Sequence, residues 1–227
     1  MSAGGTTSDE VRKLRRSVDW AMRQSLSPEE LVPMLRRLAR TAPPDSDDFS
    51  FAHRHLAELS VEQEPWLAAL SARQVIALRP EDDGAWAVLG LSYTLLGHYR
   101  AAVSSYRRAV LLSPSNPWYA HNLGHLLDIT LDRPAEAVRL LHSAHTREPR
   151  EADIAASYVH ALGRVGRTDD ARKLLKRYMK GGGNADQKAL LRWLEGGNSR
   201  LVLPAGQLPA QQSVRRKKRT RKQAPSS

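Results

Sequence analysis

The residues of this sequence best suited to chemistry lie in the stretch HNLGHLLD, residues 121–128. If the stretch is helical, His121, His125 and Asp128 are spaced by four and three residues and share one face. Two imidazoles and a carboxylate can bind a metal ion, and His160 offers a further nitrogen later in the chain. A metal site here would predict an enzyme, so the interpretation depends on the elements that position these residues.

Other signatures of catalysis do not accompany these residues. His121 and His125 lack the glutamate of the HExxH pattern of zinc hydrolases. The glycines of KGGGN, residues 180–184, lack a following Gly-Lys-Ser/Thr and favour a helix stop, and the sequence has no GxSxG elbow and no dinucleotide-binding glycine pattern. His142 and His145 belong to an otherwise polar helix face and are expected to be solvated. We therefore expect no enzyme, no cofactor and no catalytic residue.

The amino-acid composition excludes several further classes of protein. The 227 residues contain no cysteine, which excludes disulfides, thiolate nucleophiles and cysteine-ligated zinc. No apolar run approaches the roughly 18 residues of a membrane-spanning helix. The N-terminal residues lack the apolar core of a secretory signal. We expect a soluble, cytoplasmic protein with no membrane span.

The net charge of +11 is concentrated at the ends of the chain. Residues 41–196 are neutral in sum, whereas residues 197–227 carry +8 and no acidic residue. This tail has no periodic apolar pattern and is expected to be disordered. It has no aromatic residue for base stacking, so binding to nucleic acid or to an acidic partner would be non-specific. Seven basic residues form its centre: Arg215, Arg216, Lys217, Lys218, Arg219, Arg221 and Lys222.

A helical hairpin is predicted for residues 83–116. The first helix has an apolar face formed by Trp86, Leu89, Gly90 and Tyr93. Gly97 and His98 interrupt the periodicity. The second helix, which Pro114 closes, has an apolar face formed by Ala102, Tyr106 and Ala109.

This hairpin recurs along the chain at a period of 34 or 35 residues. Ala137 and Ala171 follow Ala102 at the same place in the pattern, and Gly124 follows Gly90. Such a period predicts a stacked array of helical hairpins. In residues 83–116 the pattern W-x2-L-G-x2-Y, then A-x3-Y, then P, resembles the tetratricopeptide repeat family. The copy at 117–151 has one extra residue in its loop.

The resemblance implies an all-α fold: a right-handed α-solenoid of tetratricopeptide-like hairpins with helical caps and a disordered basic C-terminal tail. Ser8 is expected to cap a first helix over residues 8–25, and the capping box at residues 27–30 predicts a second helix to about Arg40. The predicted segments are 1–7, a disordered N-terminus; 8–48, a helical pair and linker; 49–82, 83–116, 117–151 and 152–184, the repeats; 185–196, a capping helix; and 197–227, the tail.

In this family the first helix of each hairpin lines a concave groove that binds a protein or peptide. With Leu123, Gly124 and Leu127 in core positions, the resemblance implies that a set of polar residues lines this groove: His121, Asn122, His125, Asp128, His160 and Arg164. Asn122 matches the middle residue of the family's carboxylate clamp, but the basic residues expected before and after it are missing, so a clamp is not predicted.

Three interpretations of the polar set stay open at this point. It is a polar lining without chemistry, a recognition surface for a protein or peptide partner, or a metal site. The function that the sequence favours is a non-enzymatic scaffold or adaptor that mediates protein–protein interaction through the groove. The alternative is a nucleic-acid-associated protein that the basic tail anchors, with the repeats recruiting partners.

Overall fold

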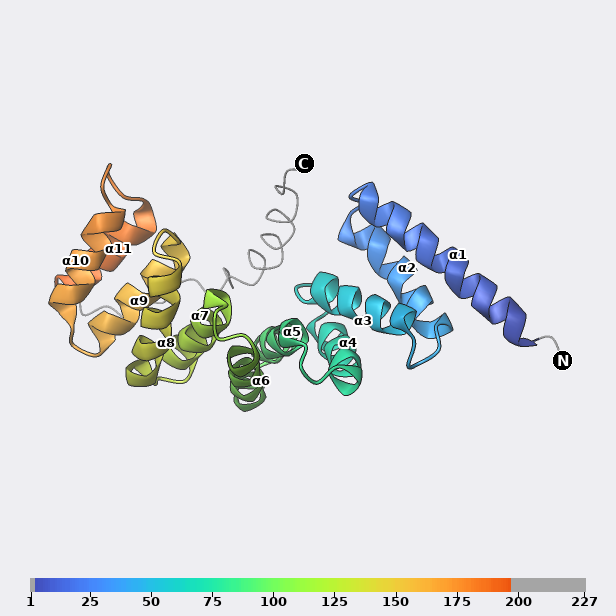
Figure 1. Cartoon of the computed structure of the whole chain (residues 1–227). Helices are drawn as coiled ribbons and strands as arrows, with labels where there is room; N and C mark the ends of the chain where they lie inside the picture. The colour runs from blue at the N-terminus through green and yellow to red at the C-terminus, as the bar shows by residue number, and fades with distance from the viewer. Residues whose placement is uncertain (1–2, 197–227) are drawn as a thin grey trace, which may run out of the picture. The chain divides into compact units, whose positions relative to one another are not determined.

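The computed structural model describes residues 3–196, and within them every regular element of secondary structure is a helix (Figure 1). The predicted basic tail, residues 197–227, lies outside the described residues, as do the first two residues. Most contacts between residues fall within one of two compact parts of the chain, and the boundary between these parts follows Leu112. We call residues 3–112 unit 1 and residues 113–196 unit 2, and each is described by itself.

Unit 1 contains six helices, and consecutive helices pack against one another. They are α1 (Ala3–Arg23), α2 (Pro28–Thr41), α3 (Asp47–Ser60), α4 (Pro65–Leu78), α5 (Asp83–Leu95) and α6 (Tyr99–Leu112). Unit 2 contains α7 (Pro117–His125), the π-helical turn η1 (Leu126–Thr130), α8 (Pro134–Arg147), α9 (Ala152–Arg164), α10 (Thr168–Tyr178) and α11 (Ala185–Leu194).

The N-terminal helix differs from its prediction. It begins at Ala3 rather than at Ser8, so residues 3–7 are helical, and it ends at Arg23. A serine inside a helix costs only about 0.5 kcal/mol relative to alanine, so a good capping residue does not oblige a helix to begin there. The predicted linker is also shorter, because Ser46 caps α3: the backbone N–H of Phe49 donates to its hydroxyl at 3.1 Å.

The predicted capping box of α2 is confirmed, since the backbone N–H of Ser27 donates to the Glu30 carboxylate at 3.0 Å. Asn116 caps α7 in the same region of the helix, with the N–H of Trp118 donating to the Asn116 side chain at 3.0 Å.

Small residues allow the two helices of a hairpin to approach closely. Ala102, Ala137 and Ala171, which recur at the repeat period, are all fully buried. Gly90 of α5 faces Tyr106 of α6, and a Cβ atom at Gly90 would lie 2.7 Å from the tyrosine ring. In unit 2 a Cβ at Gly124 would lie 2.7 Å from Leu141. The recurring glycine is therefore required by the contact between helices.

The extra residue of the 117–151 repeat widens the turn at the end of α7. In the copies at 83–116 and 152–184 the turn closes with a backbone hydrogen bond that spans five residues, from His98 to Tyr93 and from Arg167 to Leu162. The corresponding bond runs from Arg133 to Leu127 and spans six. The added residue is absorbed by the π-helical turn η1, in which the N–H of Leu131 donates to the carbonyl of Leu126.

Asp132 then takes the left-handed backbone position in this turn, with a φ of 54°. Gly97 and Gly166 hold the matching positions in the neighbouring copies, with φ of 76° and 81°. Aspartate tolerates this conformation better than most residues with a Cβ atom.

We expect the substitution Gly90→Ala to destabilise the protein by about 1–3 kcal/mol, because the new methyl group would overlap the Tyr106 ring. This loss exceeds the gain of up to about 1 kcal/mol from the better helix propensity of alanine. Gly84→Ala in the same helix is the control, since its Cβ would meet only a carboxylate oxygen of Asp82 at an ordinary 3.4 Å. Urea unfolding followed by circular dichroism measures both; equal stabilities would contradict the close contact.

Candidate functional site

The histidines of α7 meet a single hydroxyl group from α9. The Nε2 atom of His121 lies 2.9 Å from the Oγ atom of Ser157, and the Nδ1 atom of His125 lies 3.2 Å from the same oxygen. A hydroxyl has one proton to donate and two lone pairs, so it can donate to one imidazole while the other donates to it. Ser157 thus joins the two histidines and ties α7 to α9.

One helical turn further on, η1 places the carboxylate of Asp128 between two residues of α9. The Nδ1 atom of His160 lies 2.6 Å from the Oδ2 atom of Asp128, and the guanidinium of Arg164 lies 3.2 Å from Oδ1. Arg164 also donates to the backbone carbonyl of Asp128 and forms an ion pair with Asp132. The carboxylate is 1% exposed, so these partners replace the water that it loses on burial.

Helix α11 closes this region from the other side of α9. The rings of Trp193 and His160 stack at 5.0 Å between centroids and 16° between planes. Gly163 makes room for the indole, because a Cβ atom there would lie 2.4 Å from the Trp193 ring. We call this set the polar layer of unit 2: His121, His125, Asp128, Ser157, His160, Arg164 and Trp193.

Burial sets the charge of the α7 histidines. Burial, and to a smaller extent the nearby His125, lower the pKa of His121 to about 3. Burial also lowers the pKa of His125, and the Asp128 carboxylate opposes this shift in part. Both imidazoles are therefore neutral near pH 7, and they act as hydrogen-bonding groups rather than as cations.

The structure corrects the prediction that all six polar residues line an open groove. His121, Asp128 and His160 are 0%, 1% and 4% exposed; His121 faces Ser157 of α9, and Asp128 faces His160. Their burial follows from α9, which packs across the polar face of α7 and η1. Asn122, His125 and Arg164 are half-buried, so they form the part of the set that reaches the surface.

The arrangement does not resemble a metal site. The nitrogens of His121 and His125 meet Ser157, whereas the nitrogen of His160 meets Asp128, so the three do not converge on one point. Across the described residues 3–196, no group of three histidine, aspartate or glutamate side chains is placed to hold a metal ion.

A second cluster lies on α8, where solvated histidines were expected. His142 is exposed, but its Nδ1 atom lies 3.1 Å from the hydroxyl of Tyr158. His145 is half-buried, and its Nδ1 atom lies 3.3 Å from the hydroxyl of Tyr178. Since the Tyr178 hydroxyl donates to the carbonyl of Pro149, His145 must donate to Tyr178. These contacts join α8 to α9 and α10.

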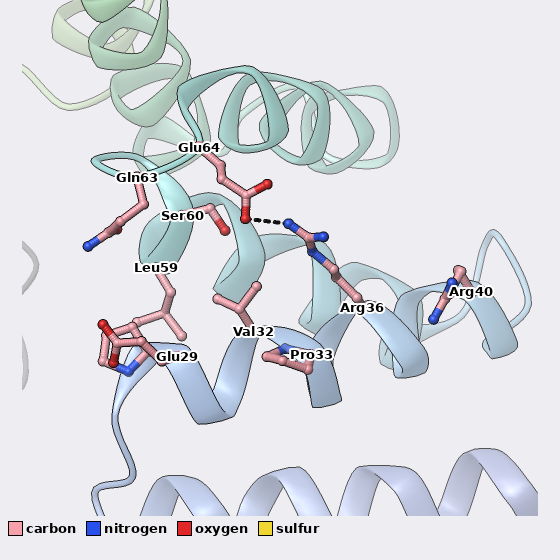
Figure 2. Close-up of a pocket in the computed structure, with 10 residues that line it drawn as sticks. Glu29, Val32, Pro33, Arg36, Arg40, Leu59, Ser60, Gln63 and Glu64 are labelled. Carbon is pink, nitrogen blue, oxygen red and sulfur yellow. Dashed lines mark hydrogen bonds and ion pairs between the residues drawn. The ribbon is translucent and has the colours of Figure 1, made fainter.

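Unit 1 has a pocket of about 420 Å³ between α2 and the turn that joins α3 to α4 (Figure 2). Arg36 of α2 forms an ion pair with Glu64 at its rim, as the dashed line in Figure 2 marks. Arg40, Glu29 and apolar residues such as Val32 complete the lining. Positive and negative side chains balance in this pocket, so its charge does not select a class of ligand.

Sequence reasoning did not find every member of the polar layer. Ser157 is separated from His125 by 32 residues and belongs to no recognisable motif. Trp193 belongs to the predicted capping helix of residues 185–196, but its stacking on His160 depends on how α11 docks. The presence of Gly163 one turn after His160 was the available signal, because a helical glycine allows a large neighbour to approach.

Comparison with known proteins supports the assignment of this fold to the stacked helical hairpins. Among solved structures, the chain is similar to a tetratricopeptide repeat protein from Parabacteroides merdae ATCC 43184, with 13% identity, a TM-score of 0.69 and coverage of 96% of this chain and 82% of that chain. It is similar to a crystal structure of MamA protein, with 16% identity, a TM-score of 0.65 and coverage of 75% and 90%. It is also similar to Pseudomonas aeruginosa pilF, with 23% identity, a TM-score of 0.63 and coverage of 82% and 83%.

These identities are low, so the solved structures establish the fold alone. The sequence itself matches families described as tetratricopeptide repeat over residues 84–116 and 129–194. The chain is a tetratricopeptide repeat protein, as the resemblance predicted. No curated protein sequence matches the chain. None of the helices within the described residues has the length and apolar character that crossing a membrane requires.

We expect the substitution Asp128→Asn to destabilise the protein by about 3–5 kcal/mol, because it removes the charge that compensates buried His160 and Arg164. Asp132→Asn is a matched control: it also removes a carboxylate paired with Arg164, but that side chain is 84% exposed and should cost less than about 1 kcal/mol. Thermal and urea unfolding at pH 7 measure both variants. If both variants lost less than about 1 kcal/mol of stability, the burial of Asp128 would not be what makes its ion pairs stabilising.

Proposed function

We propose that the protein is a non-enzymatic scaffold or adaptor whose unit 2 binds a protein or peptide partner through the surface edge of the polar layer. Tetratricopeptide repeat proteins in general mediate protein interaction, which is the broader class that the family matches support. A cytoplasmic location is part of the same proposal.

The observation that carries the proposal is the division of the polar set into buried and half-buried members. Asp128, His121 and His160 are held between helices, whereas Asn122, His125 and Arg164 reach the surface beside them. Buried partners hold His125 and Arg164 in one orientation, which reduces the conformational entropy that these side chains would lose on binding. Fixed amide, imidazole and guanidinium groups suit hydrogen bonding to the backbone or side chains of a peptide.

The test compares two double variants of the full-length protein in nuclease-treated native lysate. Asn122→Ala with His125→Gln alters the proposed surface. Arg139→Ala with Lys173→Ala is the control, because these exposed basic residues lie on α8 and α10 of the same unit. Circular dichroism first establishes that both variants keep the helical content of the parent.

We expect a partner that the parent and the control recover equally to be reduced about tenfold or more in the surface variant, the equivalent of about 1.4 kcal/mol. Equal recovery by both variants would contradict the proposed surface. A shortened chain of residues 1–196 tests the alternative function. If capture depends on residues 197–227 or disappears with nuclease, the basic tail is the anchor and the repeats are secondary.

A further inference from the structure

The polar layer of unit 2 accommodates its histidines only in a limited set of protonation states. The hydroxyl of Ser157 lies within hydrogen-bonding distance of His121 and His125, so two imidazoles face one small neutral group. When both imidazoles are neutral, one donates and the other accepts. When both are protonated, two cations donate to the same oxygen, and repulsion between them opposes the arrangement.

Acidic groups near the layer are too few to compensate these added charges. From η1, Asp128 already has His160 and Arg164 as partners. From the following turn, Asp132 pairs with Arg164 at the surface. On α9, Asp153 lies near His121, and burial raises its pKa.

Within residues 3–196, the contacts that α8 and α11 make with this region involve neutral side chains. Helix α8 meets α7 through apolar side chains, with Leu141 against Gly124. Helix α11 contributes the neutral ring of Trp193. Two protonated imidazoles of α7 would therefore lie beside a buried carboxylate that already has His160 and Arg164 as partners.

We propose that the polar layer is an acid-sensitive latch: protonation of His121 and His125 separates α9–α11 from α7 and η1, so that unit 2 opens at a pH at which unit 1 is still folded. This inference does not depend on the identity of a partner, because it concerns the stability of unit 2 itself.

The direction of the pH effect follows from proton binding. Burial lowers the pKa of both histidines in the folded state below the usual 6.5, so the unfolded state binds more protons. Their contribution to stability is complete above about pH 6.5 and decreases as the pH falls towards the folded-state values. Each histidine that must stay neutral lowers the ratio of folded to unfolded molecules by about tenfold per pH unit in that range.

Unit 1 serves as an internal comparison. Burial lowers the pKa of His53 as well, but no second imidazole faces this residue across a shared group in the described structure. The other histidine of α3, His55, lies 3.6 Å from the carboxylate of Glu58 rather than beside a second imidazole. Unit 1 is therefore expected to retain its fold to a lower pH than unit 2.

The experiment follows backbone amide and histidine ring signals of the full-length protein by NMR between pH 7.5 and 4. We expect signals of α7–α11 to lose their folded positions at a higher pH than those of α1–α6. His125→Gln keeps a hydrogen-bonding group but cannot be protonated, and it should move the unit 2 midpoint to lower pH by about half a unit or more. His98→Asn, at the exposed turn after α5, is the control and should leave the midpoint unchanged.

The unmutated protein can refute the latch without any variant. If the His121 and His125 ring signals titrate near pH 6.5 while the signals of unit 2 stay in their folded positions, the layer accepts the protons and the proposal is wrong. Simultaneous loss of both units, or a unit 2 midpoint that His125→Gln does not move, would also overturn it.

Discussion

The buried carboxylate of Asp128 is the constraint on which the arrangement of unit 2 depends. A charge that is 1% exposed must find its partners inside the protein, and here both come from α9. His160 and Arg164 are one helical turn apart, so they fix the rotation of α9 as well as its position along η1. Apolar contacts alone would allow more variation, since they have no preferred direction.

The π-helical turn is the local feature that makes this burial possible. One added residue between Leu127 and Arg133 changes the direction in which the end of the helix presents its side chains. The copies at 83–116 and 152–184, which close the same turn with a five-residue span, have no π-helical turn. The extra residue that interrupts the repeat period therefore coincides with the site that distinguishes this repeat from its neighbours. Such insertions are frequent at functional positions.

The sequence predicted the elements that depend on neighbours close in the chain, and missed those that depend on distant ones. The hairpin of residues 83–116 follows from local periodicity, and the contact of Gly90 with Tyr106 follows from the hairpin. The burial of His121 does not follow from local periodicity, because it depends on α9, which covers a face that α7 alone would leave exposed. The start of α1 was also mispredicted: the helix begins at Ala3 rather than at Ser8, because a capping residue permits a helix start without requiring one.

If unit 2 binds a partner through the proposed surface, recognition and stability share residues there. His125 reaches the surface with one part of its ring and binds Ser157 with the other, so a substitution that alters a partner contact also alters the contact between α7 and α9. Gly124 and Ala137, by contrast, serve only the packing of their hairpin. Binding measurements on His125 variants are therefore interpretable only beside their stabilities, and the same holds for Asn122, whose side chain lies beside buried His121 and influences its pKa. A loss of binding at Asn122 without a loss of stability is the observation that would assign recognition to this surface rather than to the fold that supports it.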